Sequence, residues 1–169
     1  RKKHGPFKNI YDLVKKVNLR SVNKKAMECL VYSGAFDAFP DMHRAMYLYQ
    51  PPGEPSNLEK IIRYGQAYQS QSTQSAHTLF GESNMPEIPA PKLTPCNPWE
   101  LIEQLDYEKE VIGMYLTGHP LDQYAFEQRY FNITPLSAFN EMKASNLVMS
   151  TYKKNIRLSG YITEAATRV

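Results

Sequence analysis

Residues 7–36 read FKNIYDLVKKVNLRSVNKKAMECLVYSGAF and predict two short helices joined by a tight connection. The apolar residues of the first helix recur at the spacing of one helical face: Ile10, Leu13, Val14 and Val17. Asn23 is a suitable N-cap for the second helix, and Gly34 can adopt the left-handed conformation that ends it. Residues 18–22 form a short polar connection. The sequence therefore predicts a helix, a hairpin and a helix.

Positive charge is concentrated in the same part of the chain. Residues 1–25 hold nine Lys and Arg and one Asp, a net charge of +8, whereas residues 26–169 carry −5, within an overall net charge of +3. A basic end on a mildly acidic chain favours a polyanionic partner, because phosphate contacts supply most of the sequence-independent affinity for nucleic acid. The alternative for such a run of charges is a solvated helix face.

The start of the second helix is a candidate phosphate site. Backbone N–H groups point out of a helix at this end, and the helix dipole favours an anion there. Lys24 and Lys25 occupy the first turn, where cations disfavour an isolated helix, and an anionic ligand would explain their presence. Residues 19–22, Leu-Arg-Ser-Val, lack the Gly-x-Gly of the strongest hairpins of this kind.

Beyond residue 36 the sequence predicts further helices, a linker and a strand. Helices are expected over 41–49, from 57 to about 68, over 99–117 and over 122–130, with Gly118-His119-Pro120 ending the helix that starts at 99. Residues 70–97 are polar and rich in proline, and alternation in residues 156–162 is typical of a strand. The expected fold is mainly α, with a helix-hairpin-helix region 1–69, a flexible proline-rich linker 70–97, a second helical segment 98–145 and a β segment 146–169.

No catalytic or metal site is evident in the sequence. Its four histidines are scattered without a Cys or carboxylate at ligand spacing, and no phosphate-binding glycine loop occurs. Two cysteines fit a reducing compartment, and no apolar run reaches membrane-spanning length. His119 could act as a general base, but nothing nearby completes a catalytic set, and a rigid corner between helices is the favoured interpretation. The Leu79-Phe80 pair can be a docking motif for a partner or a tether on its own chain.

Several segments resemble, in order and spacing, the bacterial replicative DNA polymerase III alpha subunits. The run Gly113-Met114-Tyr115-Leu116-Thr117-Gly118-His119-Pro120-Leu121-Asp122 is similar to the family's signature before its OB domain. Residues 156–162 look like the first strand of that OB domain. The other matching segments are 7–13, 22–37, 44–45 and 99–109.

The resemblance implies a non-catalytic segment that grips duplex DNA through helix-hairpin-helix phosphate contacts. The family has two such units, and residues 1–7 would end the first, while residues 18–25 would be the hairpin of the second. The candidate DNA-binding residues are Lys2, Lys3, Lys8, Asn18, Arg20, Ser21, Asn23, Lys24 and Lys25. No catalytic residue, metal or cofactor is expected in this chain, because the family's palm aspartates, which hold Mg²⁺ for nucleotidyl transfer, lie upstream. The parent is expected to be a DNA-directed DNA polymerase, and residues 156–162 to begin a truncated OB domain.

The resemblance also implies partners and a location. Double-stranded DNA, the sliding clamp and other replicase subunits are expected partners, in the cytoplasm and without membrane contact. The family carries a clamp-binding peptide, commonly Gln-x-x-Leu-Phe; Leu79 and Phe80 match its hydrophobic end, whereas Ala76 stands at the position of the Gln. An alternative function is therefore an interaction linker that docks on the clamp through Leu79-Phe80. A third is an unrelated helical RNA- or DNA-binding protein, against which the run 99–122 argues.

Overall fold

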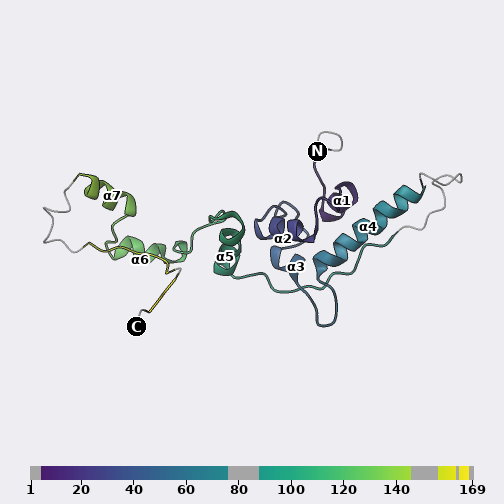
Figure 1. Ribbon diagram of the computed structural model, residues 1–169. Coiled ribbons are helices and arrows are strands. Elements are labelled where there is room, and N and C mark those ends of the chain that lie inside the picture. Colours follow the sequence, from purple (N-terminus) through teal and green to yellow (C-terminus); the bar gives the residue numbers. More distant parts are fainter. Residues whose placement is uncertain (1–4, 76–87, 146–155, 163, 168–169) are drawn as a thin grey trace. The chain divides into compact units, whose positions relative to one another are not determined.

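The computed structural model describes residues 5–75, 88–145, 156–162 and 164–167, whose regular structure is entirely helical (Figure 1). The chain forms two compact units, Arg1–Tyr115 and Leu116–Val169. The first unit contains α1 (Ile10–Lys16), α2 (Lys24–Tyr32), α3 (Arg44–Leu48), α4 (Asn57–Ser75) and α5 (Leu101–Ile112). The second contains the 3₁₀ helix η2 (Asp122–Tyr124), α6 (Ala125–Tyr130) and α7 (Leu136–Ala144). The helical part of the predicted fold is confirmed.

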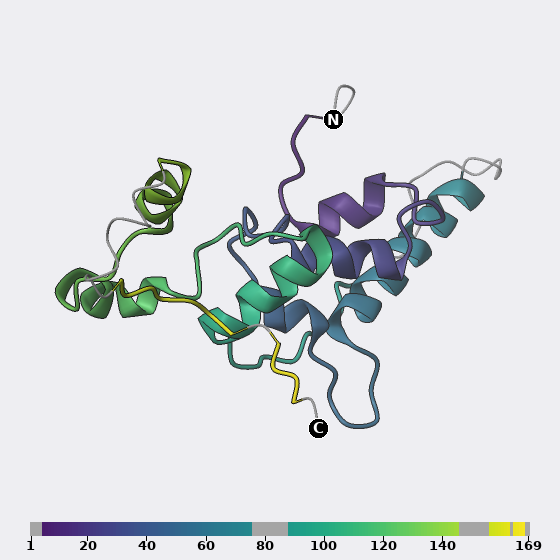
Figure 2. The ribbon, with the colours of Figure 1, turned by 60° about the vertical axis from the view of Figure 1, so that its left-hand side comes forward.

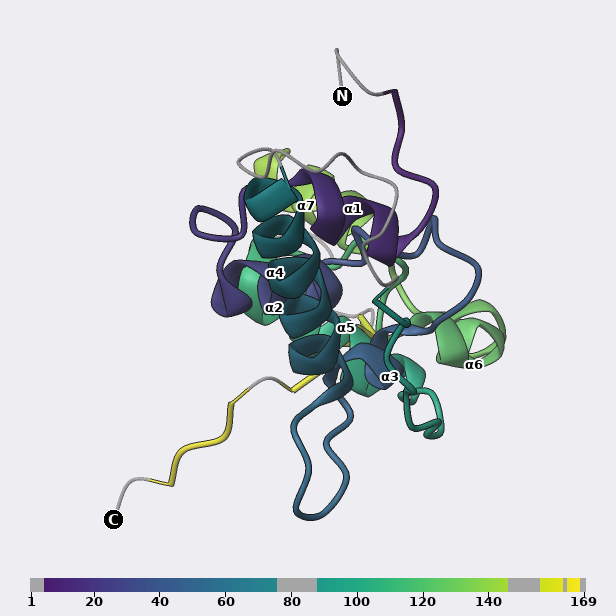
Figure 3. The same cartoon turned by 90° about the vertical axis from the view of Figure 1, so that its right-hand side faces the viewer.

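The first unit is built on the packing of α1 against α4, which lie side by side in Figure 3. Val14 of α1 and Ile61 of α4 are fully buried, and Met27 of α2 closes the same core. Burying each such side chain stabilises the fold by about 1.5–3 kcal/mol. The two helices approach closely at Gly65, where an added Cβ would lie 2.7 Å from the Cβ of Val14. Only glycine allows the two helices to come this close.

An ionic cluster fastens α5 to the rest of the first unit. Arg44 on α3 is 7% exposed and donates to the carboxylate of Asp37 at 2.6 Å and to Glu108 of α5 at 2.6 Å. Glu108 is fully buried. Figure 2 shows α5 against α2, where Tyr107 packs on Tyr32 with ring centroids 4.6 Å apart. Residues 101–112 therefore belong to the same compact unit as the hairpin.

The segment 70–97, expected to be a flexible linker, differs from that expectation at both described ends. Helix α4 continues to Ser75 and does not end near residue 68. Residues 69–75 contain no Gly or Pro, and their Gln and Ser side chains are tolerated in a helix interior. Residues 88–97 run without regular structure along the first unit. The buried side chain of Asn57 donates to the Thr94 carbonyl at 2.8 Å and accepts from the Thr94 N–H at 3.0 Å. The backbone of this segment thus satisfies a buried amide.

Two element boundaries in the carboxyl-terminal half also differ from the sequence predictions. Helix α5 ends at Ile112, because Gly113 takes the left-handed conformation with φ 86° and stops the helix before Gly118. Residues 156–162 form no strand within the described ranges. A strand requires a ladder of hydrogen bonds to a neighbour, and the backbone contact described for this segment is one bond of 2.8 Å from the Thr134 N–H to the Arg157 carbonyl.

The second unit contains the corner expected around His119. The Asp122 carboxylate accepts from the His119 N–H at 2.7 Å, and Nδ1 of His119 accepts from the Leu121 N–H at 3.1 Å. Both hydrogen bonds are local to this turn. The predicted short helix 122–130 is present as η2 followed by α6. The Nδ1 atom that accepts from Leu121 stabilises the turn. This favours the interpretation of His119 as part of a rigid corner between helices over that of a general base.

Candidate nucleic-acid interface

Asn18 organises the hairpin between α1 and α2. Its carbonyl oxygen accepts hydrogen bonds from the N–H groups of Ser21 at 3.1 Å and Val22 at 2.9 Å. Its side-chain Oδ1 accepts from the N–H of Arg20 at 3.0 Å. Leu19 is 8% exposed and packs toward Gly65 of α4, which anchors the hairpin to the core. Three hairpin amides are therefore used to shape the turn, and Asn18 builds the site rather than offering donors from it.

The first turn of α2 carries two backbone N–H groups directed out of the helix. The N-cap Asn23 accepts from the N–H of Ala26 through its side chain at 2.9 Å and from the N–H of Met27 through its carbonyl at 3.0 Å. Within the described residues, no hydrogen bond uses the N–H groups of Lys24 and Lys25. Both side chains are exposed. This pair of amides and ammonium groups has the donors that bind phosphate at a helix N-terminus.

A carboxylate lies beside this turn. Nζ of Lys24 is 3.3 Å from Oε2 of Glu59, and Nη2 of Arg63 is 2.6 Å from Oε1 of the same carboxylate. The hydrogen bond from Arg63, and to a smaller extent that from Lys24, lowers the pKa of Glu59 below its ordinary value. The pairs are solvent-exposed, so each contributes little, and Lys24 can exchange Glu59 for a phosphate at small cost.

The other predicted site residues fall into three groups. Arg20 and Ser21 are exposed on the hairpin that leads to Lys24 and Lys25, so the structure brings these four together. Lys8 precedes α1, at the opposite end of that helix from the hairpin, and its N–H donates to Asp12 at 3.2 Å. Four further predicted residues lie outside the described ranges: Lys2, Lys3, Leu79 and Phe80.

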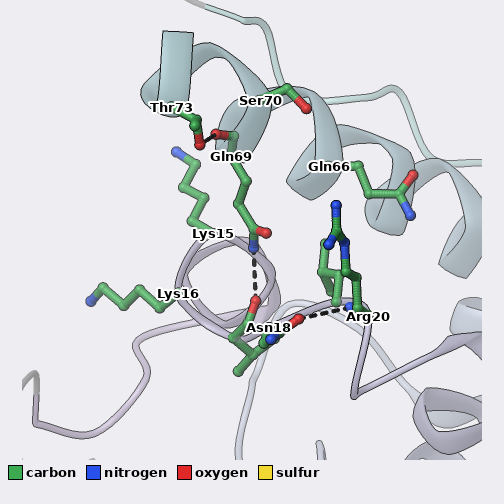
Figure 4. A pocket seen from close by; sticks show the side chains of 10 residues that line it. Lys15, Lys16, Asn18, Arg20, Gln66, Gln69, Ser70 and Thr73 are labelled. Atoms are coloured by element: carbon green, nitrogen blue, oxygen red, sulfur yellow. Dashed lines mark hydrogen bonds between the residues drawn. The ribbon is translucent and has the colours of Figure 1, made fainter. Parts of the chain in front are cut away.

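An open groove of about 920 Å³ between the hairpin and α4 was not anticipated from the sequence (Figure 4). Its walls are formed by the end of α1, the hairpin and the carboxyl-terminal half of α4. The lining residues are Lys15, Lys16, Val17, Asn18, Leu19, Arg20, Gln66, Gln69, Ser70 and Thr73. Of its α4 residues, Ser70 and Thr73 fall within the segment 70–97 expected to be a linker, whereas Gln66 and Gln69 precede that segment.

Two contacts from α4 fix the walls of this groove. The side-chain Nε2 of Gln69 donates to the carbonyl oxygens of Val14 at 2.8 Å and Val17 at 2.7 Å. These carbonyls lie at the end of α1, where a helix leaves its last acceptors unsatisfied. The ammonium of Lys15 lies 4.6 Å from the ring centroid of Tyr68, within cation–π distance. In Figure 4 the side chains of Lys15 and Arg20 both extend toward α4.

The described residues show no other chemical centre. Among them no group of three or more His, Cys, Asp or Glu residues is placed to hold a metal ion. None of the helices in the described ranges has both the length and the apolar character needed to cross a membrane.

The hairpin and most of the chain are similar to known sequences. Residues 1–46 match a family model described as a helix-hairpin-helix motif. DNA polymerase III subunit alpha of Campylobacter jejuni is 29% identical over 150 residues, covering 88% of this chain and 12% of that protein. The Thermus aquaticus protein of the same name is 34% identical, covering 73% and 9%, and that of Escherichia coli K12 is 31% identical, covering 77% and 11%. The chain thus spans about a tenth of the length of these relatives.

Proposed function

Because this chain is homologous to one segment of the bacterial DNA polymerase III alpha subunits, we propose that it is a duplex-holding segment of a replicative DNA-directed DNA polymerase. It contacts the DNA backbone through its helix-hairpin-helix and takes no direct part in nucleotidyl transfer. The observation that carries this proposal is the pair of unused N–H groups at Lys24 and Lys25, on a hairpin within the matched residues 1–46. The parent polymerase's Mg²⁺ is assigned to palm aspartates outside this chain.

The chemistry of the hairpin suits phosphate contact. Amides at a helix N-terminus, two ammonium groups and the Arg20 guanidinium contact phosphate oxygens, which are the same at every nucleotide. Binding is therefore independent of sequence and sensitive to salt. If Arg20, Lys24 and Lys25 each neutralise one phosphate, the logarithm of the binding constant falls with the logarithm of salt concentration with a slope of about −3.

Fluorescence anisotropy with a short labelled duplex, titrated at several salt concentrations between about 50 and 200 mM, tests the proposal. The double reversal Lys24→Glu with Lys25→Glu should weaken binding strongly and reduce the steepness of the salt slope by about 2. The matched control is Lys92→Glu with Lys143→Glu, which changes the net charge equally at exposed lysines outside the hairpin. Equal losses in the two double variants, or binding insensitive to salt, would contradict phosphate contact by the hairpin.

The absence of catalysis in this chain is tested separately. A primer-extension assay with Mg²⁺ or Mn²⁺ and all four deoxynucleotides should give no incorporation by the 169-residue chain. Incorporation that survives removal of contaminating polymerase would contradict a non-catalytic segment.

A second proposal is that Leu79 and Phe80 dock on the sliding clamp, with the polymerase in the cytoplasm. It rests on the Leu-Phe pair at the hydrophobic end of the motif expected for this family. Leu79→Ala with Phe80→Ala should abolish capture of the chain by immobilised clamp and leave duplex affinity unchanged. Unchanged capture would remove the proposal. We also propose that residues 156–162 begin an OB domain. This proposal rests on their sequence, because these residues form no strand in the structure.

A further inference from the structure

We propose that the DNA backbone lies in the groove between the hairpin and α4, so that α4 forms a second wall of the binding site. This inference rests on the proposed function and assigns it a further binding surface. Gln66 and Ser70 would donate hydrogen bonds to phosphate oxygens from one side, and Arg20 would supply a cation from the other. The polar end of α4 then becomes part of the interface and not a connection to the next segment.

The lining of the groove has the composition that phosphate requires. Its ten lining residues include three cations, three amides and two hydroxyls, and none of these ten carries a carboxylate. Neutral donors and cations together make most contacts to DNA phosphates. Two of the lining residues already have partners within the chain. The Nζ of Lys16 lies 2.6 Å from the Asp12 carboxylate, and the Thr73 hydroxyl donates to the Gln69 carbonyl at 2.8 Å. Within the described residues, no hydrogen bond uses the side-chain donors of Arg20, Gln66 or Ser70.

The polar side chains of α4 in the groove follow one face of the helix. Gln66, Ser70 and Thr73 recur at the spacing of one helical face, and seven residues of helix advance by about 10 Å. Successive phosphates on one strand are about 3.4 Å apart along the duplex axis and farther apart along the strand itself, so this face is long enough to meet more than one phosphate. Glu59 lies seven residues before Gln66, about 10 Å along the helix, and it does not line the groove.

The groove is formed before any ligand arrives. Gln69 ties α4 to the end of α1 through two hydrogen bonds, of 2.7 and 2.8 Å. Gly65 allows the helices to approach closely, and Leu19 packs there. Walls held in this way lose little entropy when a backbone binds between them, which favours affinity.

Neutral donors and cations predict different salt responses, and this difference provides the first test. In anisotropy titrations of the full chain, Gln66→Ala with Ser70→Ala should weaken duplex binding by about tenfold. The salt slope should not change, because neither residue releases a counterion. Arg20→Gln should weaken binding and reduce the steepness of the slope by about 1. Both variants change exposed side chains, and unaltered circular dichroism and melting temperature establish that they fold.

A matched pair on α4 provides the second test. Gln66→Glu places a carboxylate in the groove, whereas Ala67→Glu places the same charge on an exposed, non-lining position of the same helix. The proposal expects Gln66→Glu to weaken binding about tenfold more than Ala67→Glu at low salt. Equal effects of these two changes, with unchanged affinity in the double alanine variant, would overturn it. If Lys24→Glu with Lys25→Glu still weakens binding, the proposed function stands and only the α4 wall fails; if that reversal also has no effect, both fail.

Discussion

The side-chain amide of Gln69 donates to the main-chain carbonyl of Val17 at 2.7 Å, across 52 residues of sequence. The same nitrogen donates to the carbonyl of Val14 at 2.8 Å. One glutamine on α4 therefore caps the last turn of α1 and sets the point at which the hairpin begins. The position of the candidate DNA-binding turn depends on a helix remote from it in sequence.

The first prediction concerns this cap. Gln69→Ala leaves two half-buried carbonyls without their donor and should lower the free energy of unfolding by about 1–3 kcal/mol in urea denaturation. Gln69→Glu should lower it further, because a carboxylate oxygen replaces the amide and repels both carbonyls. Gln66→Ala, an exposed glutamine one turn earlier, is the control and should leave stability unchanged. Equal stability of the Gln69 and Gln66 variants would show that the cap contributes nothing.

The second prediction concerns Gly65. In an exposed helix, Gly→Ala stabilises by about 1 kcal/mol through helix propensity. At Gly65 the added Cβ would lie 2.7 Å from the Val14 Cβ and 2.8 Å from its carbonyl oxygen, so α1 and α4 must separate. Gly65→Ala should therefore destabilise the chain by about 1–3 kcal/mol, as overpacked cores do. Ala67→Gly at an exposed position of α4 measures the propensity alone. A stabilising Gly65→Ala would contradict the close packing of the two helices.

The third prediction concerns the buried carboxylate of Glu108. Glu108→Ala removes a buried partner of the Arg44 guanidinium, which keeps its ion pair with the half-exposed Asp37 carboxylate, and should lower the free energy of unfolding by about 3–5 kcal/mol. Helix α5 should then detach at a lower denaturant concentration than in the parent chain. Tryptophan fluorescence measures this detachment, because Trp99 packs on Tyr107 with ring centroids 4.5 Å apart. Glu110→Ala, exposed on the same helix, should have little effect. A small change at Glu108 would mean that the ion cluster is dispensable.

The fourth prediction concerns alkaline stability. Tyr47 is 1% exposed, and its hydroxyl has no hydrogen-bond partner in the described part of the chain. Burial raises the pKa of Tyr47 from 10.0 to about 12. The folded state favours the neutral phenol of Tyr47. The stability that this preference contributes is fully present below pH 10 and is lost as the pH rises toward 12.

Tyr47→Phe should remove that pH dependence and raise stability at neutral pH by about 1–3 kcal/mol, because it deletes an unpaired buried hydroxyl. Thermal melts between neutral pH and pH 12 measure both effects. Tyr49→Phe changes an exposed hydroxyl two residues away and should alter neither. A Tyr47→Phe chain that melts like the parent at every pH would refute the expectation.

Local signals in the sequence were sufficient for the hairpin and insufficient for what surrounds it. The caps at Asn23 and Gly34 and the spacing of the apolar residues predicted α1 and α2, because these features act within a few residues. The Asn57–Thr94 and Arg44–Glu108 contacts join residues far apart in sequence, and nothing near either partner indicates the other. For the same reason the sequence indicated Arg20 as a candidate DNA-binding residue and did not indicate that Gln66 lines the same groove.

Contacts that cross from one side of residues 76–87 to the other include Asn57 with Thr94, His43 with Cys96, and Arg44 with Glu108. The cohesion of the first unit consequently does not depend on the covalent connection between them. Coexpressed as separate polypeptides, residues 1–75 and 88–169 should reassociate and copurify, with the entropy of joining two molecules as the main penalty. The unit is thus a candidate for fragment complementation, in which peptide continuity and structural integrity can be varied independently.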